Sequence, residues 1–293
     1  MPNDNPTPPA NEAPAGEDDW RREGARELDR LRLQLNTIDD RIHDLLMERA
    51  TVVGKVADLA RAGAKAPFRP GREAQIVRRL VGRHTGKLPA QTLFRMWREL
   101  LAGTTGMQSD IQVAVGSASL ASIAREHFGT LTPMRPHETP AQALSDVASG
   151  KAAVAVLPIP TEDGDGWWTT LSRQTPRLHV IAKLPFWTKR ANGTPKEQAL
   201  VVGATEADAS SDDRGLIVAA YEPDVSQARL NAIVAAAGFE DAKMVLRRDN
   251  KIALIDTKGY VTHDDPRFGR LVAGFRDPIV LGAYAVPYDG ASA

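Results

Sequence analysis

Residues 28–49 read LDRLRLQLNTIDDRIHDLLMER, and this stretch decides the fold of the chain. Its apolar residues recur at alternating spacings of three and four, which is typical of a helix with one apolar seam. The pattern continues without proline to about residue 61, so we expect one helix over residues 20–61, roughly 60 Å long. A seam of that length cannot be buried against one short partner. We therefore expect the helix to pair with a second copy of itself.

Arg49 interrupts the seam between Leu45 and Val52. A guanidinium on a buried row costs several kcal/mol unless it is paired, which leaves two interpretations. Either the helix rotates there and Arg49 faces solvent, or Arg49 points into a cavity and binds a carboxylate through two hydrogen bonds.

Two shorter helices follow the first. The segment 64–71 contains two prolines and a glycine, and it breaks the first helix. We expect a second helix to begin near Gly71 and a third to run from residue 93 to residue 108. The three helices predict an all-α, dimerising domain over residues 20–109.

An ordered set of residues in these helices resembles the all-helical class of chorismate mutase. The resemblance covers about residues 28–108 and implies an intertwined homodimer of three-helix chains. It implies an isomerase that converts chorismate to prephenate by a Claisen rearrangement, in phenylalanine and tyrosine biosynthesis, with no metal and no cofactor. The set consists of Leu31-Arg32, Ile38-Asp39, Leu45-Leu46, Arg49, the run Phe68-Arg69-Pro70-Gly71-Arg72-Glu73, and Thr104 with Gln108, which share one helix face.

The resemblance also implies which residues bind the substrate. A unimolecular rearrangement needs a fixed conformer and stabilised charge rather than a nucleophile, and a dianion suits a pocket lined with arginines. Arg49 and Arg32 would clamp the two carboxylates, Glu73 would accept from the ring hydroxyl, and Gln108 would donate to the ether oxygen. Arg69, Arg72 and Thr104 complete the implied binding set. The implied catalytic residues are Arg32, Arg49, Arg72, Glu73 and Gln108.

The positions of the two clamp arginines support a site shared between chains. Arg32 and Arg49 are 17 residues apart in the sequence, roughly 25 Å along one helix, so both cannot reach one small substrate from the same chain. In an antiparallel dimer Arg32 would come from the partner.

One position departs from the family. The family places a lysine eleven residues after the second clamp arginine, whereas this chain has Ala60 there. Arg61 or Lys65 could supply the charge instead. Loss of one charged donor to the transition state would lower the rate on the order of 10²–10³-fold.

The second half of the chain alternates strand and helix patterns, which predicts an α/β region after the helices. Residues 111–160 resemble the first lobe of prephenate dehydratase, through Val115-Gly116, His127-Phe128-Gly129 and Val156-Leu157-Pro158-Ile159. The catalytic motifs of that family are replaced by Pro160-Thr161-Glu162 and Glu197-Gln198-Ala199. We therefore expect a truncated, catalytically inactive dehydratase-like domain over residues 110–205. The tryptophans at 167, 168 and 187 are expected to fill its core, with ligand stacking by the Trp167-Trp168 pair as the alternative.

The last part, residues 206–293, is expected to be an ACT-like α+β domain. Its pattern over residues 212–275 reads β-α-β-β-α, and Ile255-Asp256-x-x-Gly259 resembles the ACT regulatory module. The ligand-loop glycine of that module is absent near Val225-Ser226. A structural or dimerising role is therefore favoured over amino-acid sensing.

The amino-acid composition limits the kinds of ligand and chemistry that this chain can support. The chain has no cysteine, which excludes disulfides and thiolate chemistry, and its six histidines form no i,i+4 pair typical of a metal site. Lys+Arg and Asp+Glu both number 37, but the charges are unevenly distributed. All charged side chains of residues 1–19 are acidic, whereas residues 20–108 carry a net charge of +8. This basic region suits an anionic small molecule. Nucleic-acid binding is disfavoured because the arginines are spread over several helix faces.

Residues 1–19 lack an apolar stretch and basic residues, so we expect a disordered acidic tail. No run of about 18 apolar residues predicts a membrane span, and a cytoplasmic location is expected. One alternative to the mutase hypothesis stays open, because Ala60 and the eroded dehydratase motifs also suit a non-catalytic, dimeric regulatory or metabolite-binding protein.

Overall fold

The computed structural model describes residues 15–62, 68–107 and 111–290. The chain divides into two compact units, the first ending at Asp58 and the second beginning at Leu59. The first unit contains most of helix α1, and the second contains every other element. None of the helices in the described part of the chain combines the length and the apolar character needed to cross a bilayer.

Helix α1, Ala15–Ala62, confirms the long helix expected from its apolar repeat. It begins five residues earlier than expected, which corrects the prediction of a disordered tail for residues 15–19. The physical reason is that no proline occurs between Pro14 and Pro67, and the acids at 17–19 favour a helix N-terminus. Its seam side chains are exposed in the single chain, with exposed fractions from 42% for Leu31 to 62% for Leu45.

Helices α2, Pro70–Gly82, and α3, Ala90–Gly106, match the two shorter helices of the prediction. Pro70 lies in the first turn of α2, where its missing N–H has no intrahelical partner to lose. The pair packs through a small apolar cluster that includes Phe94, Phe186 and Trp187. Because Phe186 and Trp187 come from the segment after strand β4 (His179–Leu184), α2 and α3 pack against the α/β part of the same unit.

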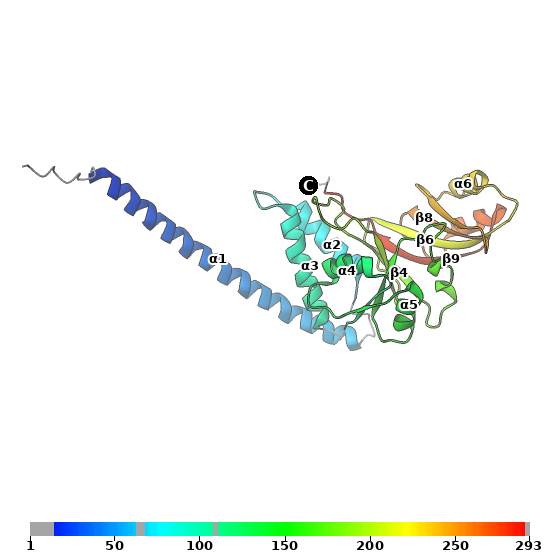
Figure 1. The fold of residues 1–293 in the computed structure, drawn as a ribbon, viewed down its shortest axis with the longest axis horizontal. Helices are drawn as coiled ribbons and strands as arrows, with labels where there is room; N and C mark the ends of the chain where they lie inside the picture. Colours follow the sequence, from blue (N-terminus) through cyan, green and yellow to red (C-terminus); the bar gives the residue numbers. More distant parts are fainter. Residues whose placement is uncertain (1–14, 63–67, 108–110, 291–293) are drawn as a thin grey trace, which may run out of the picture. The chain divides into compact units, whose positions relative to one another are not determined.

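The α/β part contains one nine-stranded sheet with the order β2-β1-β3-β5-β4-β9-β6-β8-β7 (Figure 1). Its N-terminal strands are β1 (Val113–Val115), β2 (Met134–Pro136), β3 (Val154–Pro158), β4 (His179–Leu184) and β5 (Ala199–Gly203). Strand β1 pairs in parallel with β2 and β3, and the connecting helices are α4 (Ala121–Phe128) and α5 (Pro140–Ala148). Short 3₁₀ helices occupy Ala118–Leu120, Trp167–Thr169 and Leu171–Arg173.

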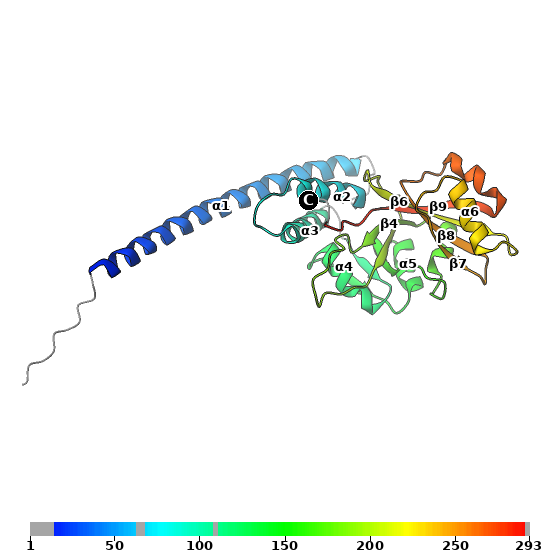
Figure 2. The same cartoon turned by 90° about the horizontal axis from the view of Figure 1, so that it is seen from above.

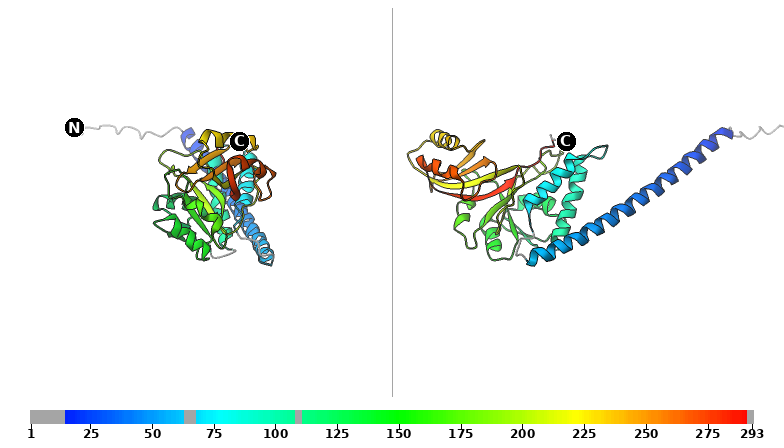
Figure 3. Two further views of the ribbon diagram at one scale, coloured as in Figure 1. Left: turned by 90° about the vertical axis from the view of Figure 1, so that its right-hand side faces the viewer. Right: turned by 180° about the vertical axis from the view of Figure 1, so that it is seen from behind.

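The C-terminal strands form the other half of the sheet. In chain order the elements are β6 (Asp213–Tyr221), α6 (Gln227–Ala236), β7 (Lys243–Arg247), β8 (Ile252–Lys258), the 3₁₀ helix η4 (Pro266–Ala273) and β9 (Phe275–Ala285). Helices α6 and η4 cover one face of these strands (Figure 3). The expected β-α-β-β-α order is confirmed, and β9 adds a sixth element that closes a β-α-β-β-α-β unit.

Strand β9 joins the two halves of the sheet. It pairs antiparallel with β6 and, at Gly282, in parallel with Val180 of β4. A Cβ atom at Gly282 would collide with the carbonyl oxygen of Val180, so only glycine allows this approach. The expected boundary between residues 205 and 206 therefore does not separate two sheets.

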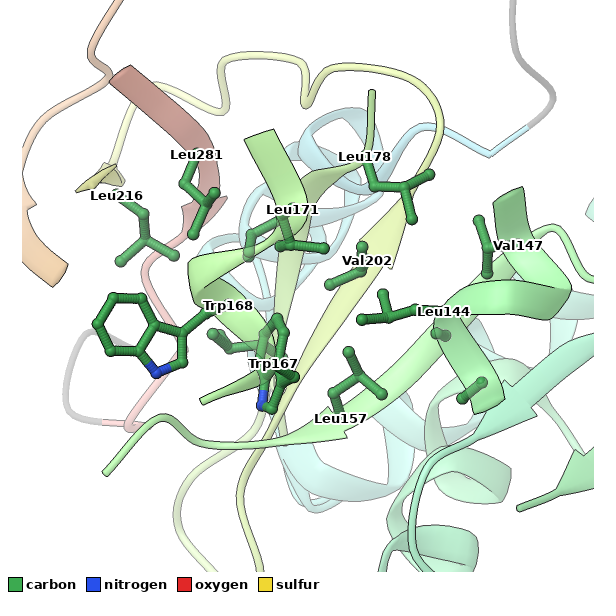
Figure 4. Packing of buried hydrophobic residues seen from close by; sticks show 14 of the residues in the cluster. Leu144, Val147, Leu157, Trp167, Trp168, Leu171, Leu178, Val202, Leu216 and Leu281 are labelled. Atoms are coloured by element: carbon green, nitrogen blue, oxygen red, sulfur yellow. The ribbon is translucent and has the colours of Figure 1, made fainter. Parts of the chain in front are cut away.

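The main apolar core also crosses that boundary. Trp168 lies near Leu216 and Leu281 of the C-terminal strands, while Trp167 lies on the side of Leu157 and Leu144 of the N-terminal half (Figure 4). Trp167, Trp168, Phe186 and Trp187 are all buried, which confirms the expectation that they fill the core. Their burial leaves no exposed indole face for the alternative role in ligand stacking.

Candidate functional site

A cavity of the second unit lies beside α2 and α3 and has a volume of about 450 Å³. Glu73 of α2 and Arg98 of α3 line it together with apolar side chains from Phe68, Phe128 and Leu131. The short segments around Ile111 and Gly129 close its other side, so the α/β part contributes to its wall. Figure 2 shows α3 beside α4.

Glu73 and Arg98 form a buried ion pair in this wall. Their exposed fractions are 8% and 5%, and Nη1 of Arg98 donates to Oε2 of Glu73 at 2.7 Å. Arg98 also donates from Nη2 and Nε to the carbonyl oxygen of His127, at 2.8 and 3.3 Å. A buried charge is tolerated when it is paired and hydrogen-bonded, and these contacts meet that condition for both residues.

The local fold explains how these side chains meet. Glu73 lies in the first turn of α2, where the helix dipole favours an acid. Arg98 lies on the buried face of α3 between Phe94 and Leu101. His127 belongs to the last turn of α4, whose carbonyl oxygens lack intrahelical donors and attract a cation.

The imidazole of His127 is buried without a hydrogen-bond partner for Nε2. Burial, assisted by the positive charge of Arg98, holds the pKa of His127 well below its usual range. The ring makes edge-to-face contacts with Phe128 and Phe68, at centroid distances of 4.8 and 6.5 Å. His127 is therefore neutral at pH 7, and the positive charge of Arg98 is paired with the carboxylate of Glu73.

The other implied residues of the second unit have partners of their own. Arg69 donates from Nε and Nη2 to the carboxylate of Asp208, at 2.8 and 3.1 Å, and these hydrogen bonds raise its pKa. Arg72 is exposed, and its Nη1 lies 3.4 Å from Oε1 of Gln75. The hydroxyl of buried Thr104 donates to the carbonyl oxygens of its own helix, 2.9 Å from that of Leu100.

The two clamp arginines lie in the first unit. Arg32 is exposed on α1 and bonds Asp29 one turn earlier, with 3.1 Å between Nη1 and Oδ1. Arg49 is partly buried, and burial lowers its pKa. Gln108 lies outside the described residues. Of the implied substrate-binding set, Glu73 is the residue that the structure places in the wall of the 450 Å³ cavity.

Sequence reasoning missed Arg98, although a signal for it was present. Phe94, Arg98 and Leu101 are spaced by four and three residues, so the arginine interrupts an apolar row as Arg49 does on the first helix. Within the described ranges, no group of three or more histidine and acidic side chains is arranged to hold a metal ion.

Comparison with known proteins finds a family match in the first part of the chain. Residues 31–109 match the family described as "Chorismate mutase type II". The chain is 28% identical over 144 residues to the bifunctional chorismate mutase/prephenate dehydratase of Stutzerimonas stutzeri, covering 46% of this chain and 39% of that protein. It is 26% identical over 142 residues to the protein of the same description from Pseudomonas aeruginosa, covering 45% of this chain and 39% of that protein.

The chain was also compared with solved structures. The prephenate dehydratase from Streptococcus mutans is 12% identical, covers 59% of this chain and 97% of its own, and superposes with a TM-score of 0.42. The chain spans about two fifths of the length of the curated relatives it matches. Residues 31–109 thus match a chorismate mutase type II domain, in a chain whose curated relatives are bifunctional chorismate mutase/prephenate dehydratases.

Proposed function

We propose that this protein is a chorismate mutase that converts chorismate to prephenate. The observation that carries the proposal is the family match over residues 31–109, which includes Glu73 in the wall of a cavity. A cavity of about 450 Å³ lies within the range of small-molecule sites. Its mixture of apolar side chains and a buried ion pair suits a cyclic substrate that carries both a ring and charged groups.

The residues act by binding and orientation. Glu73, held as an acceptor by the cation beside it, receives the hydrogen bond of the ring hydroxyl. Arg49 and Arg32 bind the two carboxylates through their guanidinium forks, and Gln108 donates to the ether oxygen, where negative charge develops. Arg72, Arg69 and Thr104 complete the implied set, and Arg69 would have to exchange its contact with Asp208 for the substrate.

A homodimer is part of this proposal. The apolar seam of α1 is exposed along six successive positions between Leu28 and Leu45, far more than a lone soluble helix leaves open. A second copy of α1 would cover the seam and bring Arg32 of the other chain to the site, since Arg32 and Arg49 cannot meet on one helix. The small molecule that binds to this shared site is the substrate chorismate.

We also propose that the α/β part has no dehydratase activity. The motifs of that family are replaced at residues 160–162 and 197–199. Fewer than 40 residues separate these two positions, too few for a second dehydratase lobe. The strands β6 to β9 continue the same sheet. Phenylpyruvate formed from prephenate by the purified protein would contradict this assignment.

The mutase proposal is tested by the loss of chorismate absorbance with purified full-length protein and two variants. Arg49→Ala should lower kcat/KM by at least about 100-fold, since a bidentate carboxylate contact is lost in a site that orients its substrate. Ala60→Lys should raise the rate, because it restores the charged donor that the family places there. Tight binding of chorismate without turnover would instead support the non-catalytic, metabolite-binding alternative.

A further inference from the structure

Arg98 is a charged residue in the wall of the candidate site to which the family resemblance assigns no role. It is 95% buried, and three of its hydrogen bonds are directed at two acceptors. Two N–H groups converge on the carbonyl oxygen of His127, and a third reaches the carboxylate of Glu73. Because a guanidinium is planar and rigid, contacts on both sides fix its position and its plane.

The carboxylate of Glu73 depends on this arrangement. Among the described residues, the guanidinium of Arg98 is the cation that bonds Glu73, whose exposed fraction is only 8%. Removing one member of a buried pair leaves the other charge without compensation. The position of the Glu73 carboxylate in the cavity wall is therefore set by where Arg98 is held.

The contacts that hold Arg98 in place come from the α/β part of the chain. His127 lies in the last turn of α4, and the segment after this helix is attached to α3, where the carboxylate of Glu99 accepts from the backbone N–H of Thr130 at 3.2 Å. A Cβ atom at Gly129 would collide with the side chain of Ala102 on α3, so the two segments are in close contact. The end of α4 cannot move without moving Arg98.

We propose that Arg98 is a positioning residue of the mutase site, which orients the carboxylate of Glu73 and is itself oriented by the end of α4. This inference rests on the proposed mutase function. It gives the α/β part a role in the mutase reaction that needs no dehydratase chemistry: it forms the wall against which Glu73 is aligned. Helices α2 and α3 and the α/β part, all within the second unit, would thus act together in the reaction.

The first test compares Arg98→Gln and Arg98→Lys in the full-length protein. Arg190→Gln is the matched control, since Arg190 holds a second Arg–Glu pair, with Glu126 of α4 at 2.6 and 2.7 Å, away from the cavity. Arg98→Gln should lower kcat/KM about 10- to 100-fold, because small displacements of an orienting group are costly. Arg98→Lys should recover part of the loss, since an ammonium still pairs with Glu73, and Arg190→Gln should stay near the wild-type value.

A purely structural role for Arg98 would give a different result. Arg98→Gln would then lower the urea midpoint while the folded protein kept the wild-type kcat/KM, and that outcome would overturn the proposal. Circular dichroism of each variant shows whether the protein assayed is folded.

A second measurement does not use the mutase reaction. The urea midpoints of the wild type, Glu73→Gln, Arg98→Gln and the double variant form a double-mutant cycle. The midpoint of the double variant should shift by clearly less than the sum of the shifts of the two single variants. Additive shifts would show that the pair is not formed and would overturn the proposal. If the wild-type protein has no mutase activity but the urea midpoints are non-additive, the proposed function is overturned while the Arg98–Glu73 pair is supported. The failure of the proposed function can therefore be distinguished from the failure of the Arg98 proposal.

Discussion

His127 is a buried neutral imidazole beside a buried guanidinium, and this makes stability depend on pH. Its pKa is depressed in the folded protein by burial and by Arg98. The unfolded chain therefore binds a proton below about pH 6.5, where the folded protein does not. We expect the free energy of unfolding to be constant above that pH and to fall as the pH is lowered from 6.5 toward 5.

Urea unfolding at a series of pH values measures this dependence. His127→Gln should flatten the slope below pH 6.5, because the unfolded and folded states then bind protons more equally at this position. His179, whose pKa burial also lowers, contributes a slope of its own, so His179→Gln in the same series separates the two. An unchanged slope in His127→Gln would contradict the expected role of burial.

The Arg69–Asp208 pair permits a second prediction at the scale of single residues. Both side chains are partly exposed, at 50% and 35%, so solvent screens their attraction. Asp208→Asn should lower the free energy of unfolding by about 1 kcal/mol or less. A loss of several kcal/mol in urea unfolding would show that the pair is the main attachment of α2 and not one of several contacts.

The candidate site could be predicted only where its residues are close in sequence. Glu73 was expected from the run 68–73, and the structure places it at the cavity. The partner of Arg69 lies 139 residues away, and the acceptor of Arg98 is a backbone carbonyl 29 residues away. Such pairs follow from how α2, α3 and α4 pack, and no spacing in the sequence records them.

Helix α1 carries the prediction that belongs to the scale of elements. Leu35→Lys with Ile42→Lys places two charges on its exposed seam, and Gln34→Arg with His43→Lys adds two charges one residue away from the seam positions. Burying an unpaired lysine in a helix pair is costly, so the seam variant should be a monomer and should lose mutase activity. The control should keep the mass of a dimer.

Light scattering coupled to size-exclusion chromatography measures these masses. A wild-type protein that is a monomer at tens of micromolar would contradict the expectation that α1 pairs with a second copy. A monomeric seam variant with full mutase activity would contradict the expectation that the site is shared.

Helix and strand positions were predictable where periodicity is strong. The long helix, α2, α3 and the order β6-α6-β7-β8 all follow from apolar spacing and turn residues. Strand β9 was missed because its sequence contains Pro278 and Gly282, which argue against a central strand. The structure uses Gly282 for the close approach to β4, a long-range contact that local patterns do not encode.

At the scale of the whole molecule, the α/β part of the second unit contains one sheet, and the apolar cluster around Trp168 combines residues from both halves of it. Gly282→Ala tests this, because its Cβ would collide with Val180 and Gly282 has a φ of 145°. We expect a loss of at least about 1–3 kcal/mol in urea unfolding, in a single transition. Gly269→Ala is the control, since nothing lies within 4 Å of its added Cβ.

Two separate transitions in Gly282→Ala would indicate that the dehydratase-like and ACT-like halves fold independently. That result would favour the two domains expected from sequence over the shared sheet.

The conversion of chorismate by the purified full-length protein tests the central claim most directly. A proton NMR time course should show the signals of chorismate replaced by those of prephenate alone, at a rate proportional to protein concentration and well above the uncatalysed rate. Phenylpyruvate should not accumulate at neutral pH. Chorismate that persists at the uncatalysed rate, with protein that is folded and dimeric, would contradict the assignment of mutase activity to this chain.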